Sequence, residues 1–289
     1  MKKLRLLPIL FCTLLVSCNL IDFSEDCIYD GNIDIRLNWN YLLEGDEKPG
    51  LTSTWIYTAP IHFYDIHEDT ILTKIPEGTH TLLAVSKVKN LETEGMDNIL
   101  SAAIQLPVIQ KDGKDYIGQA PLVYADSKNI NVQAGKTSLC EFIPRSCVQQ
   151  VILDFIIPDN GVALEVEKIT GDLSGVQSGY SFKQMQAIPS SAYLSYNARV
   201  IKEGVLRSSN FVFGMNPHKD GINAIENTLN LDLRLNDGSV HSSRIDLTRQ
   251  FDGFLSPIIT ITIEIRLGLM GMETEIVSWA TGEEGNIEI

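Results

Sequence analysis

The sequence predicts an all-β protein with two tandem antiparallel β-sandwiches, and three observations support this fold class. Apolar and polar residues alternate with a period of two along many short segments, the pattern of strands with one buried face. Turn residues separate these segments every 8–15 residues, as is typical of sandwiches. No segment keeps a helical apolar stripe for three turns. The pattern therefore favours stacked sheets over an α/β enzyme fold.

Size and composition fit two folded domains. The chain has 289 residues, of which 44% are hydrophobic and 21% are charged, ordinary proportions for a globular protein. Its net charge of −14 becomes −17 without residues 1–17, which contain Lys2, Lys3 and Arg5. Such an acidic chain repels phosphate backbones, so we expect no nucleic-acid partner.

Residues 1–17 have the features of a signal peptide. Met1–Arg5 is basic, and Leu6–Val16 is apolar but too short to cross a bilayer. The segment ends in Leu-Val-Ser-Cys, a bacterial lipobox. We therefore expect lipidation of the Cys18 thiol, then cleavage between Ser17 and Cys18 and acylation of the new amino group, with palmitate or similar acyl chains. Two or more acyl chains anchor a protein stably to a membrane.

Residues 18–30 form the predicted lipidated tether. Asn19 stands where an Asp often retains lipoproteins at the inner membrane, and the acidic tract Ser24-Glu25-Asp26 follows. This tract resembles the export signal that carries Bacteroidales lipoproteins to the cell exterior. A solvated acidic tether is the alternative interpretation. We expect the chain to be lipid-anchored in the outer membrane and to face outward.

The N-terminal sandwich is predicted over residues 31–144. Its first strand is the clearest, because apolar residues alternate with polar ones from Ile33 to Tyr41. A short helix is expected near residues 91–101. Weaker strands are expected at 61–66, 80–88, 104–109, 121–125, 129–133 and 137–143.

The C-terminal sandwich is predicted over residues 145–289. A strongly alternating strand ends at Leu235, and Asp237-Gly238 follows as a hairpin turn, since glycine accepts positive φ. The segment from Ile259 to Leu267 alternates just as clearly, and a short helix is expected near residues 247–254. Weaker strands are expected at 148–157, 164–170, 193–201, 205–213 and 239–246.

Catalytic and metal-binding patterns are missing from the sequence. It contains no Gly-x-Ser-x-Gly motif, and its five His residues lack the spacing of a zinc site. We expect no enzyme activity, no cofactor and no metal. Asp69-Thr70-Ile71 matches a short Bacteroidales acceptor motif for O-glycosylation at Thr70, although three-residue motifs often arise by chance.

Three cysteines would remain after processing: Cys27, Cys140 and Cys147. An odd number cannot all pair within one chain. A bridge between Cys140 and Cys147 is one interpretation. The other, which we favour, is that both are small buried hydrophobic residues. The three Trp residues, Trp39, Trp55 and Trp279, are expected to pack in a core or at a sheet edge.

The order of several short motifs resembles lipoproteins of the fimbrillin and fimbrial-anchor superfamily of Bacteroidales. The lipobox and Cys27 precede the first strand, and later motifs occupy the expected places, with His80 where the family usually has an aromatic residue. These later motifs are Ile35-Arg-Leu-Asn-Trp39, Gly78-Thr-His-Thr-Leu-Leu83, the turn Leu173-Ser-Gly-Val176, Phe211-Val-Phe-Gly214 and Ile245-Asp-Leu-Thr248.

The resemblance implies two transthyretin-like β-sandwiches that join other fimbrial subunits by strand complementation. It also implies an outer-membrane anchor and a host or bacterial surface receptor as partners. Stalk subunits of the family are cut after an Arg in the first domain. Arg36 lies inside a predicted strand, which favours an anchor or accessory role in adhesion or fimbria assembly.

Two points stay open at the level of sequence. The segment 258–267 could be the strand exchanged between subunits or, the interpretation we favour, an ordinary core strand of its own domain; the segments around 273–277 and 286–289 are weaker candidates for exchange. The alternative function is a surface glycan- or ligand-binding lipoprotein of a nutrient-uptake system. Exposed aromatic residues gathered at one loop end would favour that alternative.

Overall fold

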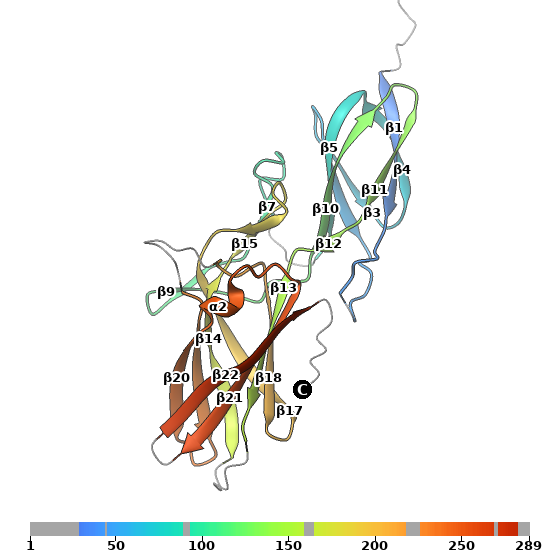
Figure 1. Ribbon diagram of the computed structural model, residues 1–289. Coiled ribbons are helices and arrows are strands. Elements are labelled where there is room, and N and C mark those ends of the chain that lie inside the picture. Colours follow the sequence, from blue (N-terminus) through green and yellow to red (C-terminus); the bar gives the residue numbers. More distant parts are fainter. Residues whose placement is uncertain are drawn as a thin grey trace, which may run out of the picture.

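The computed structural model is built almost entirely of β-strands (Figure 1), so the all-β prediction is confirmed. It describes residues 29–43, 45–88, 93–158, 165–217, 226–268 and 271–282. The predicted signal peptide, Cys18, Cys27 and the tail 283–289 lie outside the described residues. Within these ranges, no helix has the length and hydrophobicity needed to cross a bilayer.

Two sheets near the N-terminus face each other across one core. The smaller has the order β11 (Thr137–Phe142), β1 (Asp30–Leu37) and β4 (Thr70–Pro76), with β1 and β11 parallel. The larger has the order β12 (Arg145–Ser146), β10 (Tyr124–Val132), β5 (Gly78–Ser86), β2 (Thr52–Tyr57) and β3 (His62–Ile66). Inward-facing residues fill the space between the sheets, including Ile33, Ile35, Ile56, Leu82 and Phe142.

A ten-stranded sheet forms the C-terminal part. Its main path is β20 (Val240–Asp246), β19 (Thr228–Leu235), β14 (Val166–Val176), β17 (Ala192–Lys202), β18 (Val205–Val212), β13 (Gln149–Ile156), β21 (Ile258–Gly268) and β22 (Gly271–Gly282). β9 (Lys114–Ile117) pairs with β17, and β8 (Ile109–Lys111) pairs with β9.

Strand β17 lets this sheet fold over one core. Up to Ala198 it pairs with β14, and from Arg199 onward it pairs with β18. The two halves of the sheet therefore meet along β17 and enclose a shared set of apolar side chains, among them Leu153, Leu231 and Ile261. The predicted hairpin turn at Asp237-Gly238 is confirmed, because Gly238 has a φ of 85° between β19 and β20.

Segments from the two halves of the chain share a four-stranded sheet. Its order is β16 (Gln186–Ile188), β15 (Gly179–Ser181), β7 (Ala103–Gln105) and β6 (Thr93–Glu94). A third core beneath it combines Leu83 and Val85 with Tyr180 and Phe213. The domain limit between residues 144 and 145 stays a prediction.

Several local expectations are wrong. The first strand ends at Leu37 instead of Tyr41, so Trp39 lies in the following segment, where its ring meets the edge of Tyr124 at 6.2 Å. The expected helix near 91–101 is absent where the structure describes that segment, from residue 93 onward. β6 occupies Thr93–Glu94, and turns follow Gly95, which has a φ of 58°.

Two further boundaries differ. The expected strands at 121–125 and 129–133 are one continuous strand, β10. The expected turn at Leu173–Val176 is the end of β14, where Gly175 has a φ of 79° and forms a bulge. The short helix expected near 247–254 is confirmed as α2 (Thr248–Phe251).

Candidate functional site

The described residues offer no cluster of side chains for metal binding. No group of three or more His, Cys, Asp or Glu side chains in the described ranges is placed to hold a metal ion. Of the exposed aromatic residues, Phe63 lies in β3, Trp279 lies in β22, and Tyr29 and Tyr41 lie outside the strands on either side of β1. The sheet edges are the remaining candidate sites, because their unpaired backbone groups can accept another strand.

Strand β21 belongs to the core of its own chain. Ile259, Ile261, Ile263 and Ile265 are fully buried on one of its faces, and the strand lies between β13 and β22. Removing it would open the C-terminal core. Of the two exchange candidates taken from the sequence, the segment 258–267 thus fills its own domain in this structure.

Strand β22 is an end strand of the ten-stranded sheet and was not predicted as a strand over its full length. Its first half contacts the other end strand, β20, where Ser243 Oγ lies 2.8 Å from Thr274 Oγ1. β20 extends only three residues beyond Ser243 in either direction. The second half of β22 therefore continues past it.

We call residues 277–282 of β22 its free edge. Every residue from Val277 to Thr281 is exposed, and Trp279 retains 49% of its accessible surface. The expectation that Trp279 lies in a core or at a sheet edge holds for the edge, because Trp279 is on the end strand β22 and not in a core. Trp55 does pack as expected, with its ring 5.1 Å from that of Phe63.

Arg36 lies within β1, as the sequence indicates. β1 is the central strand of its sheet, with β11 on one side and β4 on the other. The Arg36 side chain is exposed and donates to Asp34 at 3.1 Å, and this hydrogen bond is the main cause that raises the pKa of the guanidinium. A protease would have to open the sheet to reach the bond after Arg36.

Thr70 stands at the start of β4, opposite Ile35 of β1, and is half-buried. The preceding Asp69 is engaged in the fold, because its Oδ1 accepts a hydrogen bond from the Leu37 backbone N–H at 2.9 Å. O-glycosylation of Thr70 stays a prediction.

Cys140 and Cys147 are both free and buried. Cys140 lies in the core between the two N-terminal sheets, and Cys147 lies in the core beneath the four-stranded sheet. Burial raises the pKa of the Cys140 thiol to about 11 and that of the Cys147 thiol to about 12. Both act as small core residues, in agreement with the favoured interpretation.

The fold is shared with proteins of known structure from Bacteroidales. A candidate adhesin from Bacteroides ovatus matches with a TM-score of 0.58 and 13% identity, covering 83% of this chain and 90% of that one. The fimbrial anchor protein Mfa2 from Porphyromonas gingivalis matches with a TM-score of 0.50 and 12% identity, covering 83% and 92%. A candidate cell adhesion protein from Bacteroides eggerthii matches with a TM-score of 0.51 and 9% identity, covering 87% and 95%.

The sequence comparisons give no match: no family model and no curated protein matches the chain. At these low identities the likeness to solved structures establishes the fold alone. It agrees with the all-β sandwich fold class that the sequence predicts, and the tandem arrangement of two domains stays a prediction. The chain covers at least nine-tenths of each of the three structures named.

Proposed function

We propose that this chain is a non-catalytic lipoprotein of the outer membrane that faces the cell exterior and serves as an anchor or accessory subunit in adhesion or fimbria assembly. Cys18 carries the lipid in this proposal. The free edge of β22 is the observation on which the proposal depends, because it offers unpaired backbone groups to a neighbouring subunit. The fold shared with candidate adhesins and a fimbrial anchor protein supports it.

The composition of the free edge favours strand addition. Edge strands usually avoid pairing with other chains by carrying charged residues or Pro. Residues 277–282 contain neither, and Val277 and Trp279 add exposed apolar surface. An incoming strand can bind along such an edge through main-chain hydrogen bonds, while side-chain contacts determine which partner binds.

The position of Arg36 supports an anchor or accessory role over a polymerising stalk role. The family's stalk subunits open their acceptor groove by cleavage after an Arg in the first domain. In this chain, cleavage after Arg36 would cut the central strand of a three-stranded sheet. The subunit is therefore proposed to accept a neighbour without this processing.

Site-specific crosslinking on intact cells tests the proposal. A photocrosslinking amino acid at Ser278, on the free edge, should capture another surface subunit. The same group at Val240, which is exposed on the opposite end strand β20, is the matched control. Equal capture from both positions, or from neither, would contradict the proposal. Protease added to the same intact cells should degrade the protein if it faces outward.

A further inference from the structure

Four basic side chains form a line across the outer face of the ten-stranded sheet. Arg234, Lys168, Arg199 and Arg207 come from four neighbouring strands, β19, β14, β17 and β18. They are far apart in the sequence, and all four are exposed. We call these four residues the basic row.

The strand register places the four residues side by side. Lys168 is paired with Arg234, and Arg199 is paired with Arg207. The β14–β17 ladder ends at the pair Ile169 and Ala198, so Lys168 and Arg199 each come one residue beyond this last pair, where β17 passes from β14 to β18. The residues next to the basic row, such as Ile169, Ala198 and Leu206, are buried. Since side chains alternate along a strand, the row points to solvent.

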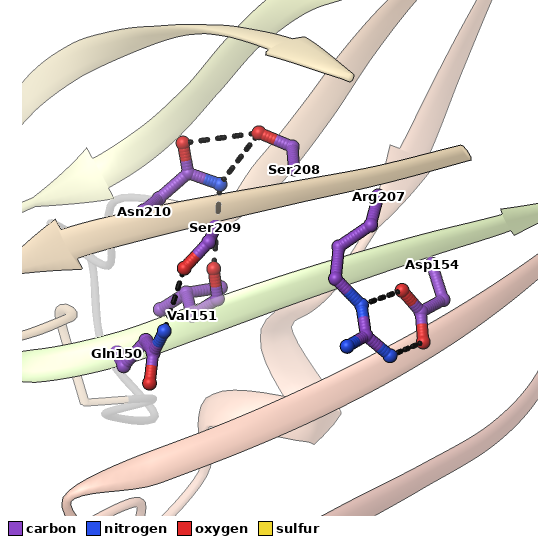
Figure 2. Close-up of polar contacts among 7 residues, drawn as sticks. All are labelled: Gln150, Val151, Asp154, Arg207, Ser208, Ser209 and Asn210. Atoms are coloured by element: carbon purple, nitrogen blue, oxygen red, sulfur yellow. Dashed lines mark hydrogen bonds and ion pairs between the residues drawn. The ribbon is translucent and has the colours of Figure 1, made fainter. Parts of the chain in front are cut away.

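Acidic side chains balance the two ends of the basic row. Arg207 donates from Nε and Nη2 to both carboxylate oxygens of Asp154 on β13, each at 2.7 Å (Figure 2). Arg234 Nε lies 3.6 Å from a carboxylate oxygen of Glu167. The side chains of the two central residues, Lys168 and Arg199, make no ion pair or hydrogen bond with any described residue.

This arrangement is unfavourable for the fold itself. Like charges on directly opposed residues of neighbouring strands destabilise a sheet. The chain has 37 acidic residues and only 23 basic ones. It therefore has enough acidic residues to place one beside every basic residue. Two adjacent unpaired cations in so acidic a chain indicate a surface that binds an anion.

The groups beside the basic row suit a polyhydroxylated ligand. Thr170 and Asn197 are paired with each other, and each lies two residues from the central cations on the same outer face. Both are uncharged and can exchange hydrogen bonds with hydroxyl groups. On the far side of Thr170, the carboxylate of Asp232 accepts a hydrogen bond from Ser242 at 2.5 Å.

We propose that the basic row binds an acidic polysaccharide whose sugar units carry carboxylate groups. Asp154 already shows how a carboxylate fits the guanidinium of this row, since the pair is bidentate. Adjacent strands are about 4.8 Å apart, so each of the pairs Arg234 with Lys168 and Arg199 with Arg207 presents two cations at about that spacing. An extended chain of uronic acids can place carboxylates on Lys168 and Arg199 and hydroxyls on Thr170 and Asn197.

Binding of the full-length protein to polygalacturonate tests this proposal. Variant K168Q/R199Q removes only the unpaired cations and should weaken binding by about tenfold or more, because charge-assisted contacts are lost. Its thermal midpoint should stay equal to that of the parent or rise. Control variant K183Q/R249Q removes one Lys and one Arg from other exposed positions and should bind like the parent.

Three comparisons make the result decisive. Fully methyl-esterified polygalacturonate keeps the sugar backbone without the charge and should not bind. Added salt should weaken binding to the charged polymer, because exposed charges are screened. The proposal is overturned if the parent does not bind polygalacturonate, if K168Q/R199Q binds as tightly as the parent, or if duplex DNA binds the basic row equally well. This surface is separate from β22, so either proposal can fail alone.

Discussion

The hydroxyl of Ser243 lies 2.8 Å from that of Thr274, and this contact brings together the two end strands of the ten-stranded sheet. It divides β22 into two halves with different surroundings. The half near Thr274 is covered by β20. The half beyond Val277 has exposed residues on both faces. Tests of assembly should therefore target the second half.

Replacing Trp279 with Lys should block subunit joining without unfolding the protein. A charged residue on an edge strand opposes the addition of another strand. Trp279 is about half exposed, so stability should change by only about 0.5 kcal/mol. Recovery of the variant with isolated fimbriae measures joining. Val240→Lys, on the other end strand, should join normally, and loss of joining in both variants would refute a specific role of the free edge.

Truncation after Gly282 separates the free edge from the C-terminal tail. If the edge of β22 accepts the neighbour, a chain ending at Gly282 should fold, reach the surface and still join fibres. A tail that acts as the exchanged strand would give a folded, displayed protein that no longer joins them. Surface labelling and recovery with fimbriae distinguish these results, and loss of folding would make residues 283–289 part of the core.

The Cys18→Ala variant should remain as an uncut precursor. Lipid transfer to the Cys18 thiol precedes cleavage before that residue, so removing the thiol should stop both steps. Metabolic labelling with palmitate and the apparent mass on a gel measure the two effects. Cys27→Ser is the matched control and should label normally, whereas undiminished labelling of Cys18→Ala would disprove the assignment.

Replacing Asp154 with Asn should destabilise the C-terminal sheet. Asp154 is only 8% exposed and binds Arg207 through two hydrogen bonds, so its loss leaves a third unbalanced cation in the basic row. We expect a loss of about 1–3 kcal/mol in the free energy of unfolding, measured with denaturant. The double variant D154N/R207Q should lose less than the two single losses added together. Strict additivity would show that the pair does not interact.

The buried thiols should be unreactive in the folded protein. Burial raises the pKa of Cys140 to about 11 and of Cys147 to about 12, so few thiolates exist at pH 8. The test uses a variant that carries Cys18→Ala and Cys27→Ser and lacks Cys12, so that only Cys140 and Cys147 remain. A chromogenic disulfide reagent should detect no reactive thiol in the folded variant and both thiols after unfolding. Because folding raises these pKa values, their contribution to stability should fall as the pH rises above about 8.5. Rapid reaction of the folded protein would contradict this.

Strongly alternating strands could be predicted from the sequence, and strands with other surroundings could not. β19 and β21 each bury one face, so their apolar residues recur at every second position. In β2, residues 52–54 are Thr, Ser and Thr, and all three are buried because cores lie near both faces of the strand. The sequence of β2 therefore shows no alternation of apolar and polar residues. β4 is interrupted at Lys74, which has a φ of 61°. A period-two search misses both kinds.

The candidate surfaces were harder to predict than the fold. The exposed end of β22 depends on where β20 stops, which is a property of the sheet order. The members of the basic row are separated by up to 66 positions, between Lys168 and Arg234, and only the strand register brings them together. The net charge of −14 also gives no sign of the basic row, because a sum over the chain contains no information about position.

The parallel pairing of β1 with β11 determines how the protein responds to mechanical load. A pull toward the N-terminus acts on β1 at its N-terminal end, near Asp30. The rest of the chain leaves β11 at its C-terminal end, at Phe142. These ends lie at opposite ends of the ladder, so tension slides the strands past each other and all their hydrogen bonds share the force. The β1–β11 ladder therefore resists traction in shear and does not open one hydrogen bond at a time.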